Sequence, residues 1–137
     1  EMCIRDRGNT VAALDELYLW LSNPVAIEYI RNCLKRVRKR DSALMMASQN
    51  LEDFDQEGVR EMTKPLFAIP PHQFLFNPGS IGKRFYMDML QLDEAEFELI
   101  RRARRGECLF KCGAERYHLK VIAPDHKAVL FGTAGGK

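Results

Sequence analysis

The chain has 137 residues, which is enough for one domain with a substantial hydrophobic core. At 46% hydrophobic and 29% charged residues it has the composition of a folded, soluble protein rather than a disordered tail, and none of its apolar stretches is long enough to span a membrane. The net charge of +2 indicates no class of partner. The basic residues nevertheless gather in two stretches: Arg31, Lys35, Arg36, Arg38, Lys39 and Arg40, and Arg101, Arg102, Arg104 and Arg105.

The first seven residues, EMCIRDR, resemble the translation of a transposon end sequence used in sequencing-library preparation. We therefore expect residues 1–7 to be a non-native segment, and the native chain to continue upstream of about Gly8. Residues 8–137 are then expected to form the C-terminal part of one domain.

The next part of the chain predicts a strand, a helix and a second strand. Val11–Leu14 is short, apolar and without helical period, which is typical of a buried strand, and residues 16–21 could form a short helix ended by Ser22-Asn23-Pro24. Residues 25–40 show helical periodicity, and Asp41-Ser42 breaks this helix. The apolar run at residues 43–47 predicts the second strand. This order indicates a parallel pair joined by a right-handed crossover, hence an α/β fold.

The rest of the chain predicts further helices and a hairpin. Helices are expected at residues 58–67, 81–90 and 94–105, the last ended by Gly106, with a strand at residues 73–76. Residues 107–112 and 116–122 alternate like a β-hairpin around Gly113-Ala114.

Polar residues follow both strands of the predicted parallel pair. Asp15-Glu16 follows the first strand and Ser48-Gln49 the second, so both pairs are expected at the carboxyl edge of the sheet, where ligands gather in such folds. An apolar strand that ends in Asp-Glu is the Walker B pattern, in which the Asp holds the magnesium shell of a nucleotide and the Glu activates water. Two solvated strand ends give the same pattern, and spacing alone weighs the two interpretations about evenly.

The order of motifs resembles a known family. LDEL, a helix ending in KRVRKR, and ALMMASQNLEDF are similar to the ATPases of conjugation and type IV secretion, which are hexameric RecA-like motors. FLFNPGSIGKRFYMDMLQLDEAEFELI and RRGECLFKCGAERYHLKV resemble later segments of the same proteins, so the similarity runs over roughly residues 9 to 133. The resemblance implies a partial RecA-like P-loop NTPase domain: a mainly parallel sheet with flanking helices and a C-terminal β-hairpin.

The resemblance also implies roles for particular residues. Asp15 would lie in the Mg²⁺ shell through water, Glu16 would be the catalytic base, and Gln49 would sense the γ-phosphate of ATP. An arginine finger reaching a neighbour's nucleotide would come from Arg36 or Arg38, and the residues do not decide between the two. The implied partners are a homohexamer, other subunits of the secretion apparatus and DNA at the basic helices, at the cytoplasmic face of the bacterial inner membrane.

One element of the family pattern is missing. The phosphate-binding loop GxxxxGK[ST] does not occur: NPGSIGKR has Asn77 in place of the first glycine and Arg84 in place of the Ser/Thr, and the terminal GTAGGK has the wrong spacing. The chain alone is therefore expected to bind ATP poorly and to be inactive, with the loop in the upstream sequence. Two alternatives remain: a basic module that binds nucleic acid or protein, and a catalytically inactive subunit that docks on an intact motor.

Overall fold

The computed structural model describes residues 10–20, 23–49, 51, 54, 58–80 and 82–132, apart from the side chains of Arg38 and Phe131. Segment 1–7, for which a non-native origin is expected, lies outside these residues. The described residues form two compact units. Unit 1 consists of the described residues up to Pro71 and of those within Ser80–Asp93. Unit 2 consists of His72–Gly79 and the described residues from Glu94 onward. None of the helices in the described ranges has the length and apolar character needed to cross a bilayer.

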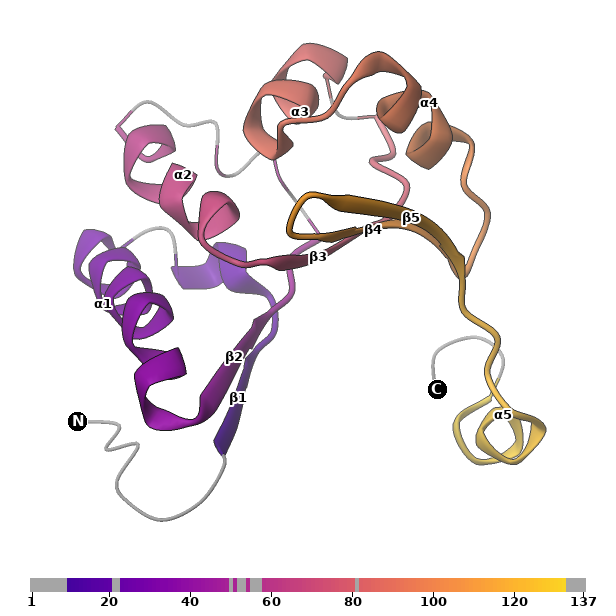
Figure 1. The fold of residues 1–137 in the computed structure, drawn as a ribbon, viewed down its shortest axis with the longest axis horizontal. Coiled ribbons are helices and arrows are strands. Elements are labelled where there is room, and N and C mark those ends of the chain that lie inside the picture. The colour runs from indigo at the N-terminus through magenta and orange to yellow at the C-terminus, as the bar shows by residue number, and fades with distance from the viewer. Residues whose placement is uncertain are drawn as a thin grey trace. The chain divides into compact units, whose positions relative to one another are not determined.

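Unit 1 contains a parallel pair of strands, as the sequence predicts. β1 (Thr10–Leu14) and β2 (Ser42–Met46) pair in register, from Thr10 opposite Ser42 to Leu14 opposite Met46. Helix α1 (Pro24–Arg36) connects them and lies along one face of the pair (Figure 1). Apart from exposed Thr10 at the start of β1, the strand residues on the face that packs into the core are half-buried, and those on the other face are exposed. The prediction of buried strands therefore holds for one face only.

Helix α1 begins where the sequence predicts and ends earlier. The side chain of Asn23 accepts hydrogen bonds from the backbone N–H groups of Val25 (2.9 Å) and Ala26 (3.4 Å). Pro24 suits the first helical position, because an N–H at that position would have no partner within the helix. Beyond Arg36 the chain tightens into the 3-10 helix η2 (Val37–Arg40). The break at Asp41 is confirmed, because this residue adopts a left-handed conformation (φ +48°).

The core of unit 1 gathers side chains from the crossover and from two later helices. α2 (Arg60–Ala68) and α3 (Lys83–Leu90) add to the apolar face of α1. The predicted short helix after β1 is the 3-10 helix η1 (Leu17–Trp20). The buried core residues are Leu17, Ile27, Ile30, Leu34, Phe54, Leu66 and Met89. Burial of each large apolar side chain is worth about 1.5–3 kcal/mol, so this cluster anchors the elements that carry the carboxyl edge of the strands.

Unit 2 is built on a separate, antiparallel sheet. Its strands are β3 (His72–Leu75), β4 (Glu107–Cys112) and β5 (Glu115–Lys120), in the order β3-β4-β5, with helices α4 (Glu94–Arg102) and α5 (Asp125–Phe131).

The predicted hairpin is confirmed, and its turn lies at Gly113, where φ is +59°. The prediction of a mainly parallel sheet holds only for β1 and β2, because β3 pairs antiparallel with β4. The alternation of apolar residues along a strand is compatible with either direction of pairing, so the sequence did not determine this one.

The end of α4 also differs from the prediction. The helix stops at Arg102, not Arg105, and Gly106 lies in the following turn with φ +82°. The turn lies so close to the chain after β5 that a Cβ atom at Gly106 would be 2.8 Å from the carbonyl oxygen of Val121. Glycine is therefore needed here to allow the approach of two backbones.

Candidate functional site

The carboxyl ends of β1 and β2 stay together beyond the last paired residues. The N–H of Ala47 donates to the carbonyl of Leu14 (2.9 Å), and the N–H of Leu17 donates to the carbonyl of Ala47 (2.9 Å). These bonds bring the residues after β1 beside those after β2. The predicted proximity of Asp15-Glu16 to the residues that follow β2 at this edge is thus seen in the structure.

Glu16 forms a sharp corner at this edge. Its φ of +50° is left-handed, a conformation that costs a residue with a Cβ roughly 1–2 kcal/mol. The corner is held by its neighbours: the carboxylate Oδ1 of Asp15 accepts the N–H of Glu16 (2.9 Å), and buried Leu17, 4% exposed, fixes the chain that follows. Sequence reasoning missed this corner, because glutamate rarely adopts a positive φ.

The corner directs the side chain of Glu16 to a residue 33 positions away. Nε2 of Gln49 donates a hydrogen bond to Oε1 of Glu16 at 2.9 Å. Asp15 and Gln49 are exposed and Glu16 is half-buried, so a solvent molecule or ligand can reach the group. The structure therefore joins two of the predicted site residues directly, and the third, Asp15, is joined to them through the backbone of Glu16.

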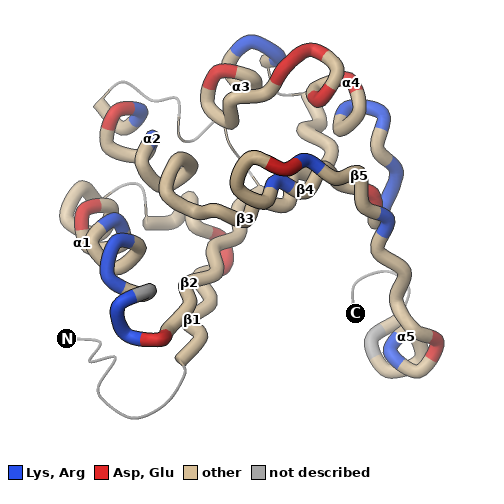
Figure 2. Tube along the Cα trace, viewed as in Figure 1, with Lys and Arg blue, Asp and Glu red and all other residues tan. Residues whose placement is uncertain are grey.

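The predicted arginines lie at the opposite edge of the strand pair. Arg36 is the last residue of α1, and η2 leads from it to the beginning of β2, so the basic stretch lies where the strands start (Figure 2). Arg36 is exposed. The side chain of Arg38 lies outside the described part of the chain. The structure thus does not bring Arg36 together with Glu16 and Gln49.

The carboxylate oxygens at this edge fit the preferences of Mg²⁺, which binds one or two carboxylates and keeps several waters. Asp15 uses Oδ1 for the N–H of Glu16, and its carboxylate is exposed. Across the described residues there is no group of three or more His, Cys, Asp or Glu side chains that could hold a metal ion. A magnesium ion at Asp15 would therefore depend on waters and on the phosphates of a nucleotide for its remaining ligands.

The segment NPGSIGKR does not act as a phosphate loop at its first position. Nδ2 of Asn77 donates to the carbonyl oxygens of Arg101 (3.0 Å) and Ala103 (3.3 Å), at the end of α4. Its Oδ1 accepts the N–H of Gly79 (2.9 Å). Asn77 thus closes a local turn and satisfies helix-terminal carbonyls, which is a structural role.

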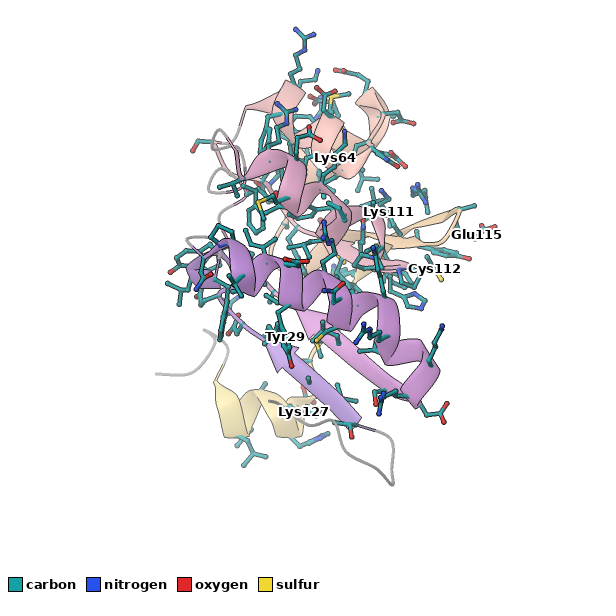
Figure 3. The ribbon with its side chains drawn as sticks, turned by 90° about the vertical axis from the view of Figure 1, so that its left-hand side faces the viewer. Tyr29, Lys64, Lys111, Cys112, Glu115 and Lys127 are labelled. Atoms are coloured by element: carbon teal, nitrogen blue, oxygen red, sulfur yellow. The ribbon has the colours of Figure 1, made fainter. Side chains whose placement is uncertain are left out.

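A second charged cluster includes Lys111 on the hairpin of unit 2, which Figure 3 labels. Lys111 on β4 is only 8% exposed and is paired across the strands with Arg116, whose Nε lies 3.0 Å from Oε1 of Glu96. Burial lowers the pKa of Lys111, as does Arg116, and the carboxylate of Glu96 opposes both. This cluster holds α4 on the sheet of unit 2.

The comparisons agree with the resemblance read from the motifs. A probable conjugal transfer protein, TrbE, of Sinorhizobium fredii is 29% identical over 96% of this chain, and the type IV secretion system protein CagE of Helicobacter pylori is 24% identical over 88%. The structure of VirB4 of Thermoanaerobacter pseudethanolicus matches 88% of the chain with a TM-score of 0.80 and 32% identity. The chain is thus homologous to conjugal transfer and type IV secretion proteins. No protein-family model matches it.

The similarity covers most of this chain but only a small part of each relative. The chain spans 20% of the TrbE protein of Sinorhizobium fredii, 13% of CagE and 33% of the VirB4 chain. It therefore corresponds to one segment of these longer conjugal transfer and secretion proteins.

Proposed function

We propose that the chain is part of the motor domain of a type IV secretion ATPase, in which the carboxyl edge of β1 and β2 hydrolyses ATP. The observation that carries the proposal is the hydrogen bond between Gln49 and Glu16, on a chain that matches VirB4 with a TM-score of 0.80. This bond joins the carboxylate that follows β1 to the amide that follows β2. Such a pair suits a RecA-like site, in which both groups would face the terminal phosphate of ATP.

Each residue at this edge has a chemical role in the proposal. Glu16 accepts a proton from water as the water oxygen attacks the γ-phosphorus, and the bond to the β–γ bridging oxygen breaks to release ADP. Asp15 would hold the Mg²⁺ of the nucleotide through water, and the bound ion would supply charge neutralisation at the phosphates. Gln49 would act on the γ-phosphate, on the attacking water or through Glu16.

As part of an ATPase, the arginines at the basic edge would act only in an assembly. Arg36 lies at the end of unit 1 opposite to Glu16, so Arg36 or Arg38 would contact the nucleotide of a neighbouring subunit in a hexamer. An arginine finger of this kind stabilises the charge of the transition state. In the proposal, other subunits of the secretion apparatus bind the motor at the cytoplasmic face of the inner membrane, and hydrolysis drives assembly or substrate transfer.

The test requires a phosphate-binding loop. Residues 10–132 replace the corresponding segment of VirB4 from Thermoanaerobacter, and ATP hydrolysis by the chimera is measured. We expect Glu16→Gln to reduce kcat about a hundredfold or more, because a general base contributes about that much. Glu28→Gln, the same change at an exposed position of α1, is the control. Undiminished hydrolysis by Glu16→Gln would remove Glu16 from the mechanism, and a chimera that assembles without hydrolysing ATP would favour an inactive docking subunit.

A nucleic-acid-binding function is the second candidate. It is favoured by the exposed basic residues at the end of α1 and in η2: Lys35, Arg36, Lys39 and Arg40. Contacts between such residues and phosphates weaken steeply with salt. The test is DNA binding by the 137-residue chain. An affinity that falls with salt and is lost in the double variant Lys39→Glu/Arg40→Glu would support this function. An affinity that changes neither with salt nor in the variant would exclude it.

A further inference from the structure

The backbone of Glu16 is fixed on both sides by hydrogen bonds. Its N–H donates to Oδ1 of Asp15 (2.9 Å), and its carbonyl accepts the N–H of Leu19 (3.0 Å). The next residue, Leu17, is buried and donates to the carbonyl of Ala47 (2.9 Å). The Cα–Cβ direction of Glu16 is therefore set by the fold before any ligand is present.

The left-handed conformation of Glu16 has no explanation in helix termination. The described part of the chain has two other non-glycine residues with positive φ, Asp41 (+48°) and Gln91 (+53°), and each is the residue that ends a helix. Left-handed residues are common at that position because they satisfy the last carbonyls of the helix. Glu16 instead follows a strand. Backbone strain away from such positions is concentrated at functional sites.

The fixed backbone leaves three side-chain torsions of Glu16 free. A half-exposed glutamate samples many rotamers, and holding one of them costs conformational entropy. The hydrogen bond from Nε2 of Gln49 to Oε1 restricts these torsions at the far end of the side chain. It occupies one carboxylate oxygen and leaves Oε2 to accept a proton.

The chemical character of Gln49 suits this arrangement. An amide donates to the carboxylate without forming a salt bridge, so it orients the base without neutralising its charge. A lysine or arginine in the same place would hold the carboxylate as an ion pair, which disfavours protonation of the carboxylate. A neutral donor is the better partner for a group that must take a proton.

We infer that Gln49 is a positioning residue, which holds the carboxylate of Glu16 in the orientation that accepts a proton from the attacking water. The inference rests on the proposed ATPase function and assigns Gln49 an action through Glu16 and not through a contact with the phosphate. Asp15 contributes by fixing the backbone corner, and Gln49 fixes the side chain.

The kinetic test uses the VirB4 chimera. Gln49→Leu keeps a side chain of similar size and removes the donor. We expect kcat to fall on the order of tenfold, since a released rotamer-rich side chain spends only part of its time in the reactive orientation, with the KM for ATP unchanged. In a Glu16→Asp background, where the shorter carboxylate no longer reaches Gln49, the same change should have no further effect. Glu28→Gln, at an exposed position of α1, is the control.

Other kinetic outcomes overturn the inference. An increase in KM together with a fall in kcat would show that Gln49 acts by contacting the nucleotide. An unchanged or increased kcat would show that the hydrogen bond is dispensable or holds Glu16 in a resting orientation. Equal effects of Gln49→Leu in the two backgrounds would show that Gln49 acts independently of Glu16.

A second measurement separates this inference from the proposed function. In the 137-residue chain, NMR of the Gln49 side-chain amide protons should show a downfield resonance that moves in Glu16→Ala and stays in Glu28→Ala, which removes an exposed carboxylate of α1. If this resonance ignores Glu16→Ala while Glu16→Gln still abolishes hydrolysis by the chimera, the inference fails and the ATPase proposal stands. If the resonance responds while Glu16→Gln hydrolyses ATP normally, the proposed function fails, and with it the catalytic meaning of the contact.

Discussion

The two units turn the chain sharply beside their strands with different residues. In unit 2 the turns on either side of β4 contain Gly106 (φ +82°) and Gly113 (φ +59°). In unit 1 the corner after β1 is at Glu16 (φ +50°). Glycine adopts positive φ at no steric cost, whereas a residue with a Cβ is strained there. Unit 1 thus keeps a side chain at a corner where glycine would turn the chain more easily.

The two units resemble each other in how these corners are held. In unit 1 the carboxylate of Asp15 accepts the N–H of Glu16 (2.9 Å), and in unit 2 Oε2 of Glu107 accepts the N–H of Arg104 (3.0 Å). Both carboxylates stabilise a turn of the backbone. Only the corner of unit 1 also presents a second carboxylate to a neighbouring strand tip. The comparison therefore identifies the side chain of Glu16, and not the turn itself, as the unusual feature.

The largest expected effect tests the glycine side of the comparison. Gly106→Ala introduces a Cβ at positive φ that would lie 2.8 Å from the carbonyl oxygen of Val121, a backbone atom that cannot move alone. We expect the free energy of unfolding of the chain to fall by about 2–4 kcal/mol, from backbone strain and overpacking together. Chemical denaturation monitored by circular dichroism measures it.

The matched control is Gly113→Ala in the hairpin turn. Its φ of +59° imposes similar strain, but a Cβ there meets no atom within 4 Å, so the cost should be only about 1 kcal/mol. Equal losses in the two variants would show that the close approach to Val121 contributes nothing.

Much of unit 1 could be predicted from the sequence, because local patterns specify it. The helical stripe of α1, the apolar runs of β1 and β2 and the polar residues after each strand placed Asp15, Glu16 and Gln49 at one edge. The direction of β3 could not be predicted, since it is set by pairing with a strand more than thirty residues away. The corner at Glu16 was equally inaccessible, because its conformation opposes the local preference of glutamate and is held by tertiary hydrogen bonds.

A smaller effect tests the glutamate side of the comparison. Glu16→Gly relieves the left-handed strain, and we expect it to raise the free energy of unfolding of the 137-residue chain by about 0.5–1 kcal/mol, although it removes the proposed base. Denaturation of the variant and of Glu16→Ala measures the effect. Alanine also loses the hydrogen bond to Gln49 but keeps the Cβ, so the difference between the variants reports the strain of the Cβ against the larger entropy of glycine in the unfolded chain. If alanine is more stable than glycine by about 0.4–1 kcal/mol, as at an unstrained position, the corner carries no strain and Glu16 does not differ from an ordinary turn residue.

The smallest expected effect concerns the carboxylate that holds the corner of unit 2. The hydrogen bond from the N–H of Arg104 lowers the pKa of Glu107, and Lys120, His118 and Arg104 add to the shift. A group whose pKa is lower in the folded state stabilises the fold above its ordinary value of 4.5, and this contribution is lost as the pH falls through the lowered pKa. Glu107→Gln should therefore be less stable than the native chain at neutral pH, and the difference should shrink in acid. Thermal unfolding across this range measures it, with Glu115→Gln on the same hairpin as the control for a change of charge. A difference in stability that stays constant with pH would mean that Glu107 holds the turn through its shape and not through its charge. Of the two carboxylates compared, only Asp15 could then hold its turn through a charged hydrogen bond.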